Sequence, residues 1–122
     1  MDLPQLAVDA TAVAAVTPVL DYVAIIAIMQ CAAKIVVVLG HEDCGAVKAA
    51  MAGQPAADLV PSILNRIYPA IRGLDPKAVE KGIRANTSLA ASTLAQYSAA
   101  IRKVPVVGAY YSVKTGRITK VG

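Results

Sequence analysis

The residues from Lys34 to Ala50, KIVVVLGHEDCGAVKAA, decide the fold of this chain. The segment opens with Lys34 to Leu39, an aliphatic and mostly β-branched run without alternation of apolar and polar positions. Such a run is typical of a strand buried on both faces, as in a parallel sheet. Gly40 ends the strand, and a helix is expected to begin near Cys44 and to continue to Met51. The segment therefore predicts a buried strand, a short loop and a helix.

Further helices are predicted on both sides of this strand. Thr17 and Pro18 form an N-cap and first-turn pair, which predicts a helix from Pro18 to Ala32. Apolar residues at helical spacing predict two more helices, over residues 59–72 and 76–102. Gly53-Gln54-Pro55 separates them from the helix that begins near Cys44.

The C-terminal residues predict a strand and a hairpin. Residues 104–111 are a second strand-like run, and Lys114-Thr115-Gly116-Arg117 has turn composition, with Gly116 able to adopt a positive φ. Ile118 to Val121 then returns as a strand. The order of elements predicts one α/β domain over residues 1–122, with a mostly parallel sheet flanked by helices. Ligand sites in such sheets lie at the carboxyl ends of the strands, where the loop after Gly40 is placed.

Composition predicts a self-associating protein outside the membrane. The chain has 122 residues, of which 57% are hydrophobic and 16% charged, against about 45–50% and about 25% in an average domain. A small domain cannot bury that much apolar surface, so we expect a homo-oligomer interface. The most apolar stretch, Val19 to Ala33, carries Asp21 and is shorter than the ~20 residues of a membrane-spanning helix. The N-terminus lacks the basic region of a signal peptide, which indicates a cytoplasmic protein.

Charge and cysteine content exclude two further classes of protein. The formal net charge is +4, but most of the basic residues are scattered and the chain has no Phe or Trp to stack on bases. We therefore expect no nucleic-acid binding. Cys31 and Cys44 are the only cysteines, too few for a disulfide framework, and they suit a reducing compartment.

His41 and Cys44 are the candidate metal ligands. They stand three residues apart in the loop between the strand and the helix, a spacing that can direct an imidazole nitrogen and a thiolate at one zinc ion. The positive N-terminal end of the helix favours an anionic ligand there. Alone, a His-x-x-Cys pair is also compatible with a buried cysteine beside a loop histidine, because two ligands do not define a zinc site.

The run from Val38 to Ala50 resembles the signature of the β-carbonic anhydrases, in which a strand ends in Gly-His-x-x-Cys-Gly. The resemblance extends over about residues 16–122. It includes the helix through Leu20-Asp21-Tyr22, the helix that begins near Val79-Glu80, and the strand and hairpin from Val106 to Gly116. It implies a dimeric or larger enzyme that interconverts carbon dioxide and bicarbonate with zinc. In that family two cysteines and one histidine hold the metal, and His41 and Cys44 match two of them.

The chain departs from the family at its N-terminus. The family's first cysteine belongs to a Cys-x-Asp-x-Arg motif, but here no cysteine precedes Cys31 and no arginine precedes Arg66. One alignment places residues 7–11 on the motif, with Asp9 on the aspartate and thus a candidate ligand or catalytic carboxylate. The other treats residues 2–16 as a rewritten form of the next strand and loop. Under either, residues 1–16 are a divergent or truncated segment without the third ligand and the arginine.

Cys31, Glu42 and Asp43 are further candidate ligands near the motif, because thiolates and carboxylates can bind zinc. Cys31 precedes the strand and His41 follows it, so about 20 Å separates them, and Cys31 is expected to be a buried helix residue. Glu42 and Asp43 are expected to cap the helix N-terminus. Gly45 could contribute to binding an anion or the substrate there.

The sequence leaves three functions open. The first is zinc-dependent hydration of carbon dioxide, weak or absent because the ligand set and the Asp–Arg pair are incomplete. The second is a non-catalytic oligomeric family member. The third is a metal-free module that binds bicarbonate, sulfate or phosphate. One of Tyr110 and Tyr111 is expected in the core or an interface, and Lys48 and Arg84 are expected in solvent or in surface ion pairs.

Overall fold

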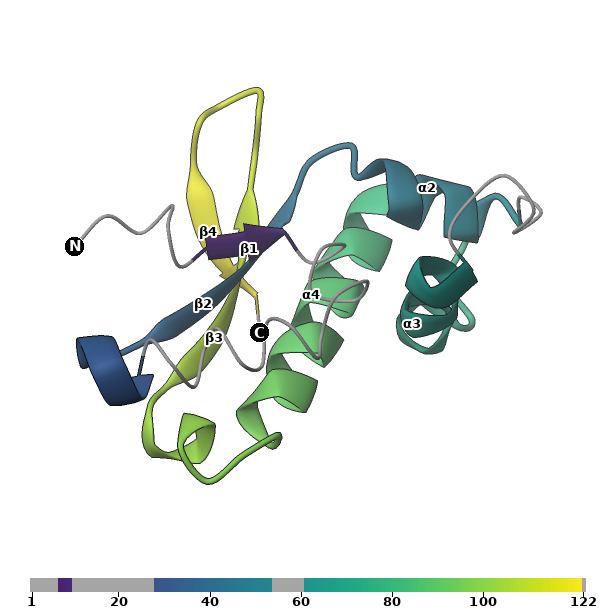
Figure 1. Ribbon diagram of the computed structural model, residues 1–122. Helices are drawn as coiled ribbons and strands as arrows, with labels where there is room; N and C mark the ends of the chain where they lie inside the picture. The colour runs from purple at the N-terminus through teal and green to yellow at the C-terminus, as the bar shows by residue number, and fades with distance from the viewer. Residues whose placement is uncertain (1–6, 10–27, 54–60, 122) are drawn as a thin grey trace.

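A computed structural model describes residues 7–9, 28–53 and 61–121. They contain a four-stranded sheet in the order β1-β2-β3-β4 (Figure 1). The strands are β1 (Ala7–Asp9), β2 (Val36–His41), β3 (Val106–Tyr111) and β4 (Ile118–Val121). β1, β2 and β3 run parallel, and β4 pairs antiparallel with β3. The predicted α/β class, the mostly parallel sheet and the C-terminal hairpin are therefore confirmed.

β2 and β3 form the centre of the sheet. Their register pairs Val36 with Val106 and His41 with Tyr111, so the carboxyl end of β2 lies beside that of β3. Both strands begin two residues later than predicted. Pro105 has no N–H to donate to the sheet, and its carbonyl accepts the N–H of Val36 at 2.9 Å just before the paired residues begin. The ladder therefore starts after this proline.

The described helices include α2 (Gly45–Met51), α3 (Pro61–Ile71) and α4 (Val79–Ala95), with a 3₁₀ turn over Ile101–Lys103. The prediction of one helix over residues 76–102 was too long at both ends. Near the end of α4 the hydroxyls of Ser92 and Thr93 bond to carbonyls four residues earlier, which weakens a helix. Ser98 Oγ then accepts the N–H of Ile101 and starts a separate turn.

The helix predicted over residues 18–32 lies largely outside the described residues. Its last part is helical over residues 28–31. Ala32 has a φ of 55°, which ends the helix before the chain enters β2. Gly116 has a φ of 70° in the C-terminal turn, as its position in the predicted hairpin requires.

α4 packs against β2 and β3, while α2 and α3 lie beyond α4 (Figure 1). The contact between α4 and the sheet is close at Gly40, where a Cβ atom would overlap Thr87 Oγ1. Two hydrophobic clusters follow from this arrangement. One joins α2, α3, α4 and Tyr110 around Leu64 and Ile67, and the other contains Val38 and Ile101.

The prediction that β2 is buried on both faces was wrong for the chain by itself. Burial alternates along β2: Val36, Val38 and Gly40 are buried, whereas Val37 and Leu39 are only partly buried. The buried face is the one that contacts α4. His41 belongs by alternation to the opposite face. Within the described segments, no helix has the length and apolar character needed to cross a membrane.

Candidate metal centre

The turn between β2 and α2 places His41 and Cys44 at the carboxyl end of the parallel strands. β2 ends at His41 and α2 begins at Gly45, with Cys44 as its N-cap residue. Asp43 has a φ of 60°, and this left-handed residue turns the chain from the strand direction into the helix. The two predicted ligands therefore lie on one tight turn, as their spacing implied.

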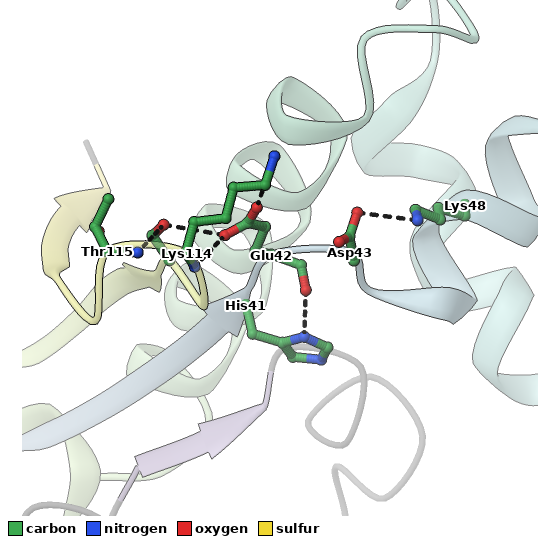
Figure 2. Close-up of polar contacts among 7 residues, drawn as sticks. His41, Glu42, Asp43, Lys48, Lys114 and Thr115 are labelled. Atoms are coloured by element: carbon green, nitrogen blue, oxygen red, sulfur yellow. Dashed lines mark hydrogen bonds and ion pairs between the residues drawn. The ribbon is translucent and has the colours of Figure 1, made fainter.

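The imidazole of His41 is held by the backbone of the next residue. Nδ1 lies 2.9 Å from the carbonyl oxygen of Glu42 (Figure 2). A carbonyl oxygen can only accept a hydrogen bond, so Nδ1 carries the proton in this contact. In a neutral ring the lone pair is then on Nε2, which is the nitrogen suited to bind a metal.

Cys44 lies at the edge of the hydrophobic core. Its side chain is 3% exposed and belongs to the cluster that contains Val47 and Tyr110. The carbonyl of Cys44 accepts the N–H of Lys48 at 3.0 Å, the first hydrogen bond of α2. Neither Cys44 nor Cys31 forms a disulfide. The thiol is therefore fixed to the first turn of a helix and shielded from solvent.

Glu42 connects this turn to the C-terminal hairpin, a role that the sequence analysis missed. Its Oε1 accepts hydrogen bonds from Ser112 Oγ at 3.0 Å and from the N–H of Lys114 at 3.1 Å. Its Oε2 lies 3.6 Å from Lys114 Nζ. The N–H of Lys114 is the main cause that holds the pKa of the Glu42 carboxyl below its ordinary value. The observed pairing of β2 with β3 explains the contact, because it places the residue after β2 beside the residue after β3.

The prediction that Glu42 and Asp43 cap α2 was wrong. The N-cap residue is Cys44, and no side chain caps the helix there. Glu42 turns to the hairpin instead, and Asp43 Oδ1 pairs with Lys48 Nζ at 3.0 Å (Figure 2). The hydrogen bond from Lys48 lowers the pKa of Asp43. Lys48 is therefore in a surface ion pair, as predicted.

The described residues offer two candidate metal ligands and no third. Among the residues whose side chains the structure describes, 28–53 and 64–121, no group of three His, Cys, Asp or Glu side chains could hold a metal ion. Cys31 precedes β2 and His41 ends it, in agreement with the prediction that they cannot share a metal. Cys31 is exposed, however, and not buried as predicted, because it lies in the last helical turn before β2 and faces solvent.

Asp9 and Gly45 were the remaining candidates. Asp9 ends β1 and is paired in register with Leu39, so its backbone lies at the same edge of the sheet as His41. The ligand role of Asp9 stays a prediction. Gly45 is exposed, and a Cβ atom there would meet nothing within 4 Å. Its role in binding an anion also stays a prediction.

A cleft of about 360 Å³ lies on the hairpin side of Glu42. Tyr110 lines it and is 5% exposed, which confirms the prediction that one of the two tyrosines is in the core. Burial is the main cause that raises the pKa of this phenol. The Arg84 guanidinium lies 4.4 Å from the centre of the Tyr110 ring and pairs with Glu80 at 3.1 Å. Arg84 is thus in a surface ion pair, as expected.

The donor types of this turn fit zinc, but their number does not. An imidazole and a thiolate are the ligands that zinc prefers, and a structural site has four ligands while a catalytic site has three plus water. His41 and Cys44 supply two, and the described residues add no others around them. The turn therefore carries two residues of the types that bind zinc, which is fewer than a zinc site requires.

Comparisons with known proteins agree with this fold. The family model for carbonic anhydrase matches residues 10–118. In a structural comparison, the chain is similar to the β-carbonic anhydrase CafA of the fungal pathogen Aspergillus fumigatus, with a TM-score of 0.68 and 23% sequence identity. The match covers 81% of this chain and 53% of the fungal chain. A comparison with curated protein sequences gave no match.

The chain belongs to the carbonic anhydrase family, and its fold is that of the β class. The resemblance predicted from Val38 to Ala50 is therefore confirmed. The chain spans about half the length of the fungal enzyme that it matches. The family match begins at residue 10, after Asp9, so it does not align Asp9 with a family residue.

Proposed function

We propose that this chain is a carbonic anhydrase-family protein that binds zinc weakly through His41 and Cys44, and that its hydration of carbon dioxide is weak or absent. The observation that carries the proposal is the placement of both residues on the turn from β2 to α2. Membership of the carbonic anhydrase family gives the substrates, carbon dioxide and bicarbonate. Bound zinc would supply a Lewis acid that activates water for attack on carbon dioxide.

Two features of the turn support a metal at this position. The contact between His41 Nδ1 and the Glu42 carbonyl orients the ring in the way that second-shell partners orient metal-ligating histidines. The thiol of Cys44 is shielded from solvent, so the protein holds it in place before a metal arrives. His41 would bind through Nε2 and Cys44 through Sγ.

The same geometry supports weak binding. With two protein ligands, water would fill the other positions around zinc, and each missing ligand lowers the affinity. We therefore propose that turnover is far below that of a complete family enzyme.

The two cysteines provide a matched pair of variants to test the proposal. Zinc affinity is measured by competition with a chromophoric chelator for the wild type, Cys44→Ser and Cys31→Ser. Hydration of carbon dioxide is measured on the same samples with zinc supplied. Cys44→Ser should abolish zinc binding, whereas Cys31→Ser should bind like the wild type because Cys31 is exposed and precedes β2.

Several results would count against the proposal. Zinc binding that survives Cys44→Ser would place the metal elsewhere. Hydration at the rate of a complete family enzyme, abolished by His41→Ala, would show a full site and contradict the weak one. Absence of zinc binding together with stabilisation of the fold by bicarbonate, sulfate or phosphate would favour the metal-free anion-binding module instead.

We also propose that the chain forms a homo-oligomer. The face of the sheet opposite α4 carries Val37, Leu39 and Val107 at partly buried positions, and Ile118 at 57% exposure. This apolar face agrees with the surplus of hydrophobic residues in the composition. Sedimentation of the wild type and of Ile118→Lys tests it, since the added charge should shift the chain toward the monomer. A monomeric wild type at micromolar concentration would contradict it.

A further inference from the structure

We propose that Glu42 is a positioning residue for His41. Its carboxylate ties the turn after β2 to the C-terminal hairpin, and this tie fixes the carbonyl group that holds the His41 imidazole. The inference rests on the proposed function in that it takes His41 as the metal ligand. The positioning itself is a property of the metal-free chain and can be measured without a metal.

The first step is the attachment of the Glu42 side chain. One carboxylate oxygen accepts from both Ser112 Oγ and the N–H of Lys114, so the side chain spans the first residues after β3. The side chain is 14% exposed, whereas that of Lys114 is 84% exposed. An ammonium so exposed contributes little through its charge. The hydrogen bonds to Ser112 and to the Lys114 backbone are therefore the contacts that hold Glu42.

The second step is the rigidity of the segment that receives Glu42. The N–H of Ser112 donates to the carbonyl of Arg117 at 2.9 Å, and the N–H of Gly116 donates to the carbonyl of Ser112 at 2.8 Å. Ser112 Oγ also accepts the N–H of Thr115 at 3.4 Å. Ser112 is thus fixed by the closed turn, and its hydroxyl is a fixed donor for Glu42.

The third step joins these contacts to the imidazole. The N–H of Glu42 donates to the carbonyl of Tyr111 at 2.9 Å, so the backbone nitrogen of Glu42 is attached to the last residue of β3 and its side chain to the segment that follows. The carbonyl of the same residue accepts from His41 Nδ1. Because the backbone nitrogen and the side chain of Glu42 are both held, rotation about its backbone bonds is restricted. Its carbonyl group therefore stays directed toward the His41 ring (Figure 2).

Asp43 restrains the turn from the other side. Its left-handed backbone turns the peptide after Glu42 into α2, and its exposed ion pair with Lys48 adds little to this restraint. The carbonyl of Glu42 therefore lies between a segment fixed to the hairpin and a segment fixed to the helix. Loss of the Glu42 carboxylate would release the hairpin side and let this carbonyl turn away from His41.

The experiment uses His41 as its own probe, because it is the only histidine in the chain. Nitrogen NMR of the imidazole in metal-free, full-length protein, at a pH where the ring is neutral, gives the ratio of the Nδ1–H and Nε2–H tautomers. The wild type should be mainly Nδ1–H. Glu42→Ala should shift the ring signals toward the Nε2–H form. Ser112→Ala should shift them in the same direction by less, because the Lys114 N–H remains.

Two matched variants separate positioning from charge. Glu42→Gln keeps an oxygen acceptor for Ser112 and the Lys114 N–H, and Lys114→Ala keeps its backbone donor. Both should retain the wild-type tautomer ratio. A folded Glu42→Ala protein with the wild-type ratio would overturn the proposal. If Glu42→Ala does not fold, Ser112→Ala decides, and an unchanged ratio in that variant overturns it.

Zinc affinity is the second measurement. Glu42→Ala should weaken zinc binding by about 10-fold, the lower end of the usual loss when an outer-shell partner is removed. Equal affinities in the two proteins would contradict positioning of a ligand. If the wild type binds no zinc, the proposed function fails, while the tautomer ratio still decides whether Glu42 positions His41.

Discussion

The carboxylate of Glu42 accepts a hydrogen bond from the backbone N–H of Lys114, which is 72 residues later in the chain. This contact joins the two segments that follow β2 and β3 at one edge of the sheet. It also joins the turn that carries His41 and Cys44 to the C-terminal hairpin. The fold thus places the candidate ligand His41 next to a residue whose three polar groups are all in hydrogen bonds.

Acid should destabilise the protein partly through Glu42. The hydrogen bond from the Lys114 N–H lowers the pKa of this carboxyl in the folded state, so the unfolded chain binds a proton more readily. Glu42 therefore adds stability above its ordinary pKa of ~4.3, and this is lost as pH falls through the lower folded value. Denaturant unfolding from pH 7 to pH 3 should show a shallower decline for Glu42→Gln than for the wild type. A parallel decline in both would contradict this.

Substitution by alanine should destabilise the protein at Gly40 but not at Gly45. A Cβ atom at Gly40 would overlap Thr87 Oγ1, and Thr87 is fully buried between α4 and the sheet. Gly40→Ala should therefore cost about 1–3 kcal/mol of unfolding free energy, as overpacking usually does. Gly45→Ala meets no atom and should cost nothing. Thermal unfolding of both variants tests the pair, and equal stabilities would contradict the close contact of α4 with β2.

Two leucines test where the core lies. Leu64 on α3 is 1% exposed, whereas Leu89 on α4 is 38% exposed. Leu64→Ala should lower the unfolding free energy by about 2–5 kcal/mol, since it leaves a cavity in the core. Leu89→Ala should lower it by far less. Denaturant titration compares them, and a larger loss for Leu89→Ala would show that α4 packs through its other face.

Asp43 should accept glycine better than a β-branched residue. Its φ of 60° is costly for most side chains and costs glycine nothing. Its ion pair with Lys48 is exposed on both sides, so its loss should matter little. Asp43→Gly should leave the melting temperature unchanged or raise it, and Asp43→Val should lower it. A large loss in Asp43→Gly would show that the ion pair matters more than the backbone.

Local sequence predicted the order of the elements well. The apolar run before Gly40 predicted β2, and Gly116 predicted the turn of the C-terminal hairpin. The errors arose where contacts between residues distant in the sequence determine which side chains are buried. The partial exposure of Val37 and Leu39 depends on which face α4 covers, and an uninterrupted apolar run carries no such information.

The candidate ligands were predicted from the motif, but their surroundings were not. From the local sequence, Glu42 was predicted to accept hydrogen bonds from the unbonded N–H groups at the start of α2, because capping is the common role of an acidic residue before a helix. The segment after β3 offered a hydroxyl and an N–H on the other side, and the carboxylate bonds to those. A contact across 70 residues can be inferred only once the strand pairing is known.

Cobalt substitution tests most directly whether His41 and Cys44 bind one ion. A thiolate bound to cobalt gives a charge-transfer absorption band, and the tetrahedral geometry favoured by such ligands gives strong visible bands. We predict a charge-transfer band in the wild type and in Cys31→Ser, its loss in Cys44→Ser, and weaker cobalt affinity in His41→Ala. A wild type without this band, or a band that persists in Cys44→Ser, would contradict a metal site on the turn from β2 to α2.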